Sequence, residues 1–204
     1  MLNKEWKIIE VFGRKPWEKV TFKQVKQLSK NKSDNYVHGV LKKFSKMGVL
    51  SAEKYGNSIV YSLAHSQAAV RIVSFISEHK SSLLNLPHEL INELMKVIPT
   101  SYFTFIITGS YAEQKQTRKS DLDVVVICDN FRNTKEILVP IKNKGDLSVP
   151  RVHPYVFTEA QFYEMLINDE ENFGKEAARK HLIVFGGESF YRILFKAIGH
   201  GFKS

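Results

Sequence analysis

Apolar residues recur every three or four positions through much of the first third of the chain, which is the period of an amphipathic helix. This period predicts three helices, at residues 4–12, 22–28 and 33–47. Thr21 and Ser33 stand just before or at the start of the second and third of them, where a hydroxyl side chain can cap the first turn. The chain is therefore expected to begin with three short helices, two of them capped.

Two short runs rich in apolar and β-branched residues follow the third predicted helix. Residues 49–54 and 58–63 flank a Tyr55-Gly56-Asn57 turn, and this arrangement predicts a β-hairpin. Three helices and then a hairpin is the element order of a winged helix-turn-helix. Residues 1–65 resemble the prokaryotic winged-helix DNA-binding domains, which implies that this segment binds double-stranded DNA.

Residues 66–204 are expected to form a second domain, which makes the whole chain α+β. Three apolar runs, at residues 103–107, 124–127 and 151–157, predict the strands of a small mixed sheet. Helices are expected at residues 67–80, 87–98, 133–143, 159–167 and 189–198, and the polar segment at residues 170–179 is also interpreted as a helix.

The net charge of +9 is concentrated in the first predicted domain. Residues 1–65 hold 13 Lys or Arg against 5 Asp or Glu, whereas residues 66–204 hold 17 against 16. A local basic excess of this kind is typical of a nucleic-acid-binding surface, although a solvated basic face is the simpler interpretation of any single lysine. The asymmetry predicts two domains with different partners.

Composition disfavours several classes of protein. No apolar run is long enough to span a membrane, and the N-terminus lacks the apolar core of a signal peptide. The single cysteine, Cys128, cannot form an internal disulfide. These features predict a cytoplasmic protein with no membrane partner.

On the winged-helix interpretation, the helix at residues 33–47 enters the major groove of DNA. The predicted contacts are Asn35 and His38 with base edges, Lys42, Lys43 and Lys46 with phosphates, and Lys54 and Asn57 with the backbone or the minor groove. A winged helix that contacts another protein is the alternative for the whole motif.

The second domain carries the most specific motif in the chain. Gly109 and Ser110 end one predicted strand, and Asp121 and Asp123 open the next. Because side chains alternate along a strand, the two aspartates are expected to point to the same face. Their carboxylates repel each other unless a cation lies between them, and such oxygen ligands suit Mg²⁺ or Mn²⁺. Gly109 lets the backbone approach a phosphate closely, so the motif predicts a phosphate cradle beside a metal-binding pair.

This combination of a Gly-Ser pair and an Asp-Leu-Asp segment resembles the nucleotidyltransferase superfamily of DNA polymerase β. It is most similar to the small prokaryotic members called minimal nucleotidyltransferases. The resemblance implies a palm-like fold, an NTP such as ATP as substrate, and transfer of NMP with release of pyrophosphate. It also implies that Asp121 and Asp123 hold one or two Mg²⁺ ions and that Gly109 and Ser110 grip the triphosphate.

Two positions depart from the family pattern in the loop after the Gly-Ser pair. The arginine and glycine that family members commonly carry there are Glu113 and Gln114 in this chain. A phosphate-binding charge is thereby replaced by its opposite. Lys115, Arg118 or Lys119 from the same loop is expected to substitute, and Lys115 and Arg118 are the predicted nucleotide-binding cations.

The family often takes a third carboxylate from a later strand, but residues 151–157 contain none. His153 stands near the expected position, where a neutral imidazole would act as a base or a metal ligand. Simple packing at the strand edge is an equally good interpretation of His153. Asp146 and Glu159 flank the strand and are the other candidates for the missing acid.

Two functional hypotheses follow from the motif and the resemblance. The first is a metal-dependent nucleotidyltransferase that modifies a protein side chain, an RNA end or a small molecule. Some minimal nucleotidyltransferases are antitoxins that modify a toxin protein, which makes a toxin one candidate partner. The second is a transcription regulator or antitoxin whose nucleotidyltransferase-like domain senses a nucleotide without turnover. A homodimer is compatible with both.

Overall fold

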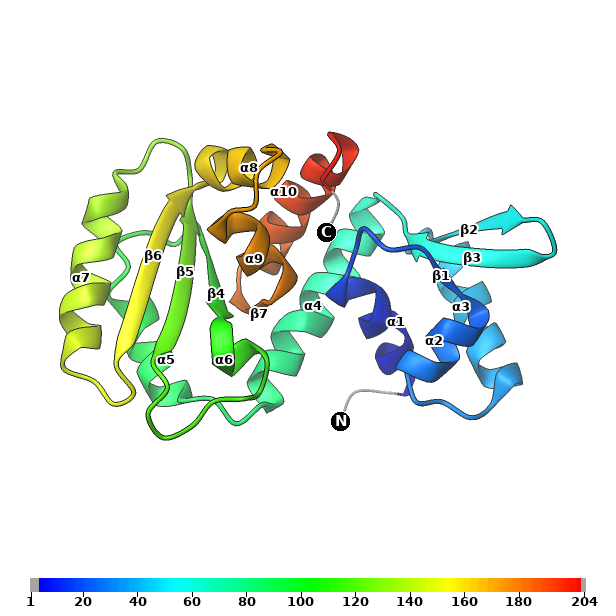
Figure 1. Cartoon of the computed structure of the whole chain (residues 1–204), viewed down its shortest axis with the longest axis horizontal. Helices are drawn as coiled ribbons and strands as arrows, with labels where there is room; N and C mark the ends of the chain where they lie inside the picture. The colour runs from blue at the N-terminus through cyan, green and yellow to red at the C-terminus, as the bar shows by residue number, and fades with distance from the viewer. Residues whose placement is uncertain (1–3, 203–204) are drawn as a thin grey trace. The chain divides into compact units, whose positions relative to one another are not determined.

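The computed structural model describes residues 4–202, which form two compact units whose boundary along the chain falls within helix α4 (Gln67–Leu83) (Figure 1). Residues 4–76 belong to unit 1 and residues 77–202 to unit 2. The division predicted at residue 65 precedes α4.

Unit 1 contains three helices and a small antiparallel sheet. Its elements in chain order are α1 (Lys4–Arg14), β1 (Val20–Thr21), α2 (Phe22–Leu28), α3 (Asp34–Lys46), β2 (Leu50–Tyr55) and β3 (Ser58–Leu63). The strand order is β1-β3-β2, with both pairings antiparallel. The three helices and the hairpin occur in the predicted order, and the two-residue strand β1 was not predicted.

Capping residues and an apolar core explain the helices of unit 1. Thr21 caps α2 in a capping box with Gln24, and the Ser33 hydroxyl accepts the backbone N–H of Tyr36 at the start of α3. The inward faces of the helices and strands bury a common set of apolar side chains. This set includes Ile8, Ile9, Phe12, Val25, Val37, Leu41, Phe44, Leu50 and Leu63.

Unit 2 is built around a four-stranded mixed sheet of order β6-β5-β4-β7. Its strands are β4 (Phe103–Thr108), β5 (Leu122–Cys128), β6 (Val152–Thr158) and β7 (Leu182–Phe185). Its helices after α4 are α5 (His88–Lys96), α6 (Gly109–Ala112), α7 (Thr134–Asp146), α8 (Glu159–Ile167), α9 (Phe173–Arg179) and α10 (Gly187–Gly199). The β5–β6 pairing is parallel and the other two are antiparallel. The predicted small mixed sheet is confirmed, although its fourth strand, β7, was not predicted.

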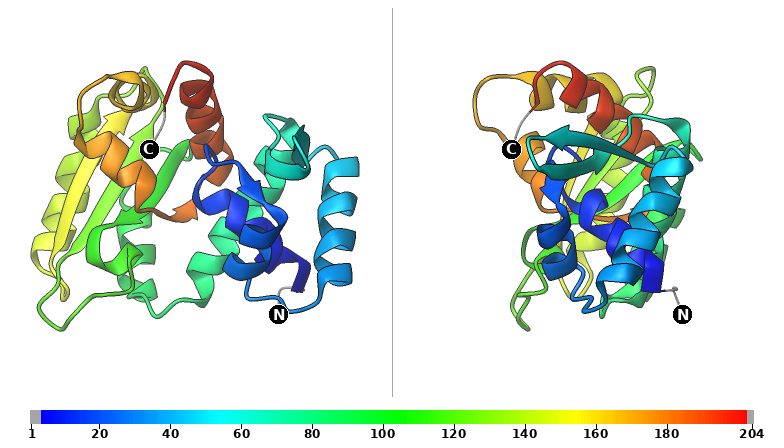
Figure 2. Two further views of the ribbon diagram at one scale, coloured as in Figure 1. Left: turned by 45° about the vertical axis from the view of Figure 1, so that its right-hand side comes forward. Right: turned by 90° about the vertical axis from the view of Figure 1, so that its right-hand side faces the viewer.

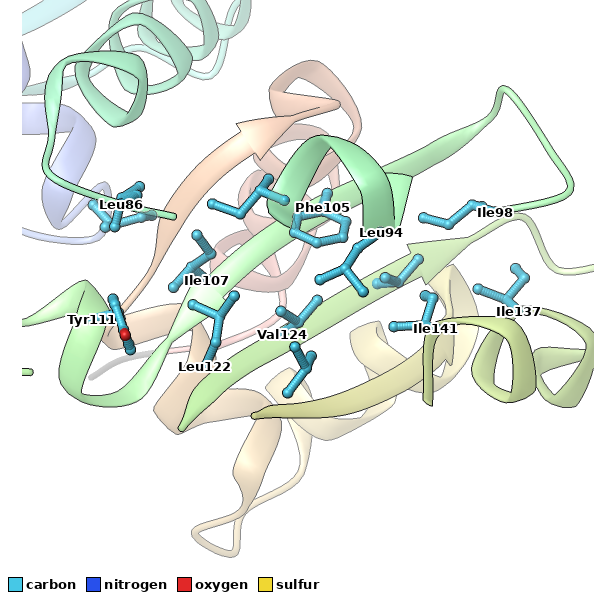
Figure 3. Close-up of a cluster of buried hydrophobic side chains, with 14 of the residues drawn as sticks. Leu86, Leu94, Ile98, Phe105, Ile107, Tyr111, Leu122, Val124, Ile137 and Ile141 are labelled. Carbon is cyan, nitrogen blue, oxygen red and sulfur yellow. The ribbon is translucent and has the colours of Figure 1, made fainter. Parts of the chain in front are cut away.

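One face of this sheet packs against α5 and α7. Alternate β5 residues, including Leu122 and Val124, point into this layer and meet Leu94 of α5 and Ile141 of α7 (Figure 3). All four side chains are essentially inaccessible to solvent. Burying apolar side chains in this way contributes roughly 1.5–3 kcal/mol each, so this layer is a main source of stability for unit 2.

The other face of the sheet is covered by α8, α9 and α10 (Figures 1 and 2). Phe173 of α9 packs on Tyr155, with ring centroids 4.3 Å apart, and also contacts Phe157. His153 stands two and four residues before these aromatic residues on β6, so its side chain points to the same face. By register, Asp123 of β5 also points there. The polar end of this face, beside α9, holds the candidate site.

His181, just before β7, ties α9 to α10 and makes the stability of unit 2 sensitive to acid. Its Nδ1 lies 2.7 Å from the Ala178 carbonyl oxygen, and its ring packs on Phe190. Desolvation lowers the pKa of His181 to about 4. The folded protein therefore holds this imidazole neutral under conditions in which an exposed histidine is protonated.

We expect acid to destabilise unit 2 through His181. Because the unfolded chain binds this proton near pH 6.5 and the folded one only near pH 4, stability is full above pH 6.5 and falls as the pH drops toward 4. The expected loss at pH 5 is about 1–2 kcal/mol, measured by urea unfolding at pH 7 and pH 5. His181→Gln should flatten this difference, whereas His88→Gln, at an exposed histidine, should not. An unchanged difference in His181→Gln would contradict the assignment.

None of the helices within residues 4–202 is both long and apolar enough to cross a lipid bilayer.

Candidate functional site

Three strands of unit 2 bring the motif residues together at one end of the sheet. In the strand register, Asp123 of β5 pairs with Thr108 at the end of β4 and with His153 near the start of β6. Asp121 immediately precedes β5, two residues before Asp123. The backbone N–H of Leu122 donates to the Arg151 carbonyl at 2.8 Å, which fixes the start of β5 against β6.

His153 lies between the two carboxylates. Its Nε2 is 3.6 Å from Asp121 Oδ2, and its Nδ1 is 3.6 Å from Asp123 Oδ1. Both separations exceed an ordinary hydrogen bond, so the imidazole is close to both acids without being locked to either. About half of the His153 side chain is exposed, which leaves it accessible to a substrate.

Gly109 is the point at which the backbone touches the acidic pair. Its φ is +66°, a conformation that side chains rarely adopt. A Cβ at this position would lie 2.3 Å from Asp123 Oδ2, so no larger residue fits without moving that carboxylate. Glycine therefore allows the turn into α6 and lets the Asp123 carboxylate approach the backbone directly, with Ser110 next along the chain.

Holding Asp123 ionised is unfavourable in this setting. Desolvation raises the pKa of Asp123; His153 opposes the rise, whereas Asp121 and Glu176 of α9 add to it. A bound cation would offset both the desolvation and the repulsion between carboxylates. Partly desolvated carboxylates that repel each other are typical of divalent-metal sites in proteins.

The donor set fits a magnesium or manganese ion that is shared with a substrate. Asp121, just before β5, and Asp123, within it, supply carboxylate oxygens that each lie 3.6 Å from His153. Within residues 4–202, no cluster of three or more His, Cys, Asp or Glu side chains is arranged to enclose a metal. Mg²⁺ seldom needs such a cage, because it is usually held by one or two carboxylates together with substrate phosphates and water.

The loop after α6 holds the predicted nucleotide-binding cations. Lys115 Nζ lies 3.3 Å from a Glu113 carboxylate oxygen, so this lysine is partly neutralised by a neighbouring acid. Arg118 lies further along the same exposed loop. The loop therefore offers two cations, Lys115 and Arg118, together with the carboxylate of Glu113.

The backbone at Gln114 has a left-handed conformation that is held by hydrogen bonds within the loop. Its φ is +57°, the left-handed conformation that favours glycine, and its Nε2 donates to the Tyr111 carbonyl at 2.8 Å. Backbone N–H groups of Gln114 and Lys115 donate to carbonyls of Tyr111 and Ser110, which ends α6 with a tight C-terminal turn. Glycine would suit this conformation, and glutamine adopts it here at an energetic cost.

Two residues beside the acidic pair have roles that the sequence did not predict, although Ser120 belongs to the motif that contains both aspartates. The Ser120 hydroxyl accepts the backbone N–H of Thr117 at 2.9 Å, which holds the loop that leads into Asp121. Glu176 of α9 is close enough to raise the pKa of Asp123. An alternating strand pattern can reveal Asp121 and Asp123, but no local signal indicates that a helix some fifty residues later returns to them.

The two other candidates for the missing third acid lie outside β6, where helices begin or end. Glu159 follows the far end of β6, six residues after His153 and so about 20 Å along the strand. Asp146 ends α7, and its carboxylate lies 3.6 Å from Arg151. His153 lies within 4 Å of both aspartates.

The candidate DNA contacts of unit 1 lie on α3 and on the β2–β3 hairpin. Asn35, Lys42 and Lys46 are seven and four residues apart and lie exposed on one face of α3. His38 is exposed beside them, but its ring stacks on Phe22 at 3.8 Å. Lys43 lies on the flank next to α1 and pairs with Glu5 at 2.7 Å. On the hairpin, the exposed candidates are Lys54 and Asn57.

Comparison with known proteins gives one family match, in unit 2. Residues 91–184 match the family model described as nucleotidyltransferase domain. No curated protein and no solved structure was found to match the chain. The matched residues lie entirely within unit 2 and include Gly109, Asp121, Asp123 and His153. Unit 2 therefore contains a segment similar to nucleotidyltransferase domains.

Proposed function

We propose that the protein is a metal-dependent nucleotidyltransferase in which Asp121 and Asp123 bind a divalent cation and an NTP donates NMP to an acceptor. The observation that carries this proposal is the side-by-side placement of Thr108, Asp123 and His153 across three strands, with Gly109 against the Asp123 carboxylate. The match of residues 91–184 supports the same reaction class.

The residues of the site suit the parts of such a reaction. The open backbone at Gly109 and Ser110 accepts the triphosphate, and Lys115 or Arg118 adds positive charge. His153 Nε2, when unprotonated, takes the proton from the attacking hydroxyl. Mg²⁺ or Mn²⁺ would be held by Asp121 and Asp123, and it would stabilise the charge that develops on the transferring phosphoryl group. A protein side chain, an RNA end or a small molecule would serve as the acceptor.

Glu113→Arg is expected to strengthen nucleotide binding. The substitution removes the carboxylate that pairs with Lys115 and adds a second cation to the loop, so two positive charges face the phosphates. The dissociation constant of a non-hydrolysable ATP analogue with Mg²⁺ should fall roughly tenfold, measured by calorimetry. Glu136→Arg, an equal charge change in the first turn of α7, is the control. Equal affinity in Glu113→Arg and the wild type would remove this loop from the nucleotide site.

A nucleotide-sensing regulator is the second candidate function. The Glu113–Lys115 pair favours it, since a site that neutralises its own phosphate-binding cation suits binding and release better than rapid turnover. Such a protein would bind NTP and metal with wild-type Asp121 and Asp123, yet release no pyrophosphate. The turnover measurement described in the Discussion separates these two candidates.

Unit 1 is proposed to be a winged helix-turn-helix that binds duplex DNA through the exposed face of α3. Its three helices, antiparallel hairpin and concentrated positive charge support this. Asn35 at the start of α3 is the proposed base contact, together with His38 if its ring leaves Phe22. Lys42 and Lys46 are the proposed phosphate contacts, and the hairpin residues Lys54 and Asn57 reach the backbone or minor groove.

The pair of substitutions Lys42→Gln and Lys46→Gln is expected to weaken duplex binding at all sequences. Each lysine that contacts a phosphate contributes about 0.9 to the slope of log affinity against log salt, so the double variant should lose nearly two units of slope. Fluorescence anisotropy with a labelled duplex at several salt concentrations measures it. Lys23→Gln, an exposed lysine of α2, is the matched control. A double variant with the wild-type slope would exclude this face.

A further inference from the structure

Unit 1 contains a groove of about 980 Å³. Its lining includes none of the residues proposed above to contact DNA. One wall is α1, and the other is the turn between α2 and α3, including Lys30 and Lys32. Its volume is at the top of the range for a pocket that holds one small molecule, about 300–1,000 Å³. Because both walls belong to residues 4–36, the groove is complete within unit 1.

Positive charge runs the length of the groove. Lys4, Lys7 and Arg14 lie three and seven residues apart along α1, which places them on one side of the helix over about 15 Å, and Lys15 follows directly after it. Lys30 and Lys32 face them from the turn.

The groove also contains two carboxylates, each of which forms an ion pair with a cation of the groove. Glu10 pairs with Arg14, and Glu18 pairs with Lys15 at 2.7 Å. Lys4, Lys7, Lys30 and Lys32 make no ion pair with any residue among 4–202, so four cations remain for a ligand.

The Lys30 backbone carries a conformation that its side chain disfavours. Its φ is +53°, in the left-handed region where glycine is usual. The backbone N–H groups of Lys30 and Asn31 donate to carbonyls of Gln27 and Lys26, the hydrogen bonds of a helix C-terminal turn. Glycine would form the same turn with less strain. A lysine here therefore gives the groove a cation at the expense of stability, which is a pattern found at binding sites.

Apolar side chains line the interior between the cations. Phe12 and Val20 are buried there, whereas Leu28 remains 59% exposed, and Tyr36 of α3 is half-buried in the same lining. A compact anion such as inorganic phosphate would need cations that converge on one point and would make no use of these surfaces. An elongated chain of phosphates with apolar or aromatic groups between them matches both features.

We propose that this groove binds single-stranded nucleic acid, with the backbone phosphates on the lysines and sugars or bases against Leu28 and Tyr36. Proteins that bind single strands without strong sequence preference combine a cationic groove with apolar and aromatic surfaces in this way. A duplex is too stiff and wide to enter a concave groove between a helix and a turn, whereas one flexible strand can follow it. The strand could be RNA or DNA, since both present the same phosphate spacing to the lysines.

The test is fluorescence anisotropy of the full chain with labelled oligo-dT, oligo-U and a duplex. The double variant Lys7→Gln/Lys32→Gln should bind the single strands roughly an order of magnitude more weakly and lose about 0.7 of salt slope per lysine. Binding of the duplex should stay unchanged. Lys42→Gln/Lys46→Gln on α3 is the matched control and should leave single-strand binding intact. Preference between oligo-U and oligo-dT identifies the source of the strand.

Lys30→Gly separates a binding role from a structural one. The substitution removes strain and a cation together, so the melting temperature should rise by a few degrees while single-strand affinity falls. Three results would overturn the proposal: groove variants with wild-type single-strand affinity, groove variants that weaken only the duplex, or free tripolyphosphate that competes as well as an oligonucleotide of matched phosphate concentration. Because the duplex and α3 controls are read in parallel, failure of the groove is distinguishable from failure of the proposed DNA-binding face.

Discussion

The double variant Asp121→Asn/Asp123→Asn is expected to lose Mn²⁺ binding completely while remaining folded. Asparagine keeps the shape of both side chains but removes both negative charges, and a neutral amide is a poor ligand for a hard divalent cation. Isothermal titration with Mn²⁺ should give measurable heat for the wild type and none for the variant. Asp129→Asn, at the opposite end of β5, should bind Mn²⁺ as the wild type does.

Melting temperatures add a signature that a merely damaged protein would not show. Because desolvation and the neighbouring acids make an ionised Asp123 unfavourable, the metal-free double variant should melt at or above the wild-type temperature. Mn²⁺ should raise the wild-type melting temperature and leave that of the variant unchanged. A variant that still gained stability from Mn²⁺ would place the metal elsewhere.

His153→Ala is expected to reduce the rate of nucleotidyl transfer by a factor of about 10² to 10⁴, the range typical of general acid–base catalysis. Both imidazole nitrogens are 3.6 Å from a carboxylate, so the ring can reach the same substrate atoms as the acids. The side chain is about half exposed, so its removal should change unfolding free energy by well under 1 kcal/mol. Rate and stability are therefore expected to separate.

His153→Asp is the informative partner of the alanine variant. It restores the carboxylate that nucleotidyltransferases often carry at this position, and it should retain or raise activity if the position acts on the metal or the attacking hydroxyl. If His153 only packs at the strand edge, the alanine variant should lose some stability and no intrinsic rate. An alanine variant with wild-type turnover would show that the two aspartates suffice, or that Glu176 of α9 takes the role.

Local sequence patterns were enough to predict most helices and strands, because the caps and turns that bound them are formed by residues close in sequence. The strand at Ser58–Leu63 and the helix at Glu159–Ile167 have the predicted bounds. Helix α4 runs past the predicted end at residue 80, because Ser81 and Ser82 bond back to carbonyls of the preceding turn instead of breaking it. Strand β1 could not be predicted, since its two residues are strand only through pairing with β3.

Sequence patterns likewise predicted some features of the candidate site and not others. Alternation along a strand predicted that Asp121 and Asp123 share a face; Asp121 lies just before β5, and both carboxylates are 3.6 Å from His153, whose position was proposed from the family resemblance. The proximity of Glu176 depends on the packing of α9 over the sheet, which no short sequence pattern encodes. The pairing of Lys115 with Glu113 likewise depends on how the loop folds, although both residues were singled out by their departure from the family pattern.

Pyrophosphate release is the most direct test of the proposed reaction. The wild type, with Mg²⁺ or Mn²⁺ and α-labelled NTPs, should release pyrophosphate and transfer label to an acceptor, which is either the protein itself or a component of a cell extract. Asp121→Asn/Asp123→Asn should do neither, and Asp129→Asn should do both. Wild-type protein that binds metal and NTP yet releases no pyrophosphate with any NTP and acceptor fraction would contradict the proposed catalysis and favour a nucleotide-sensing regulator.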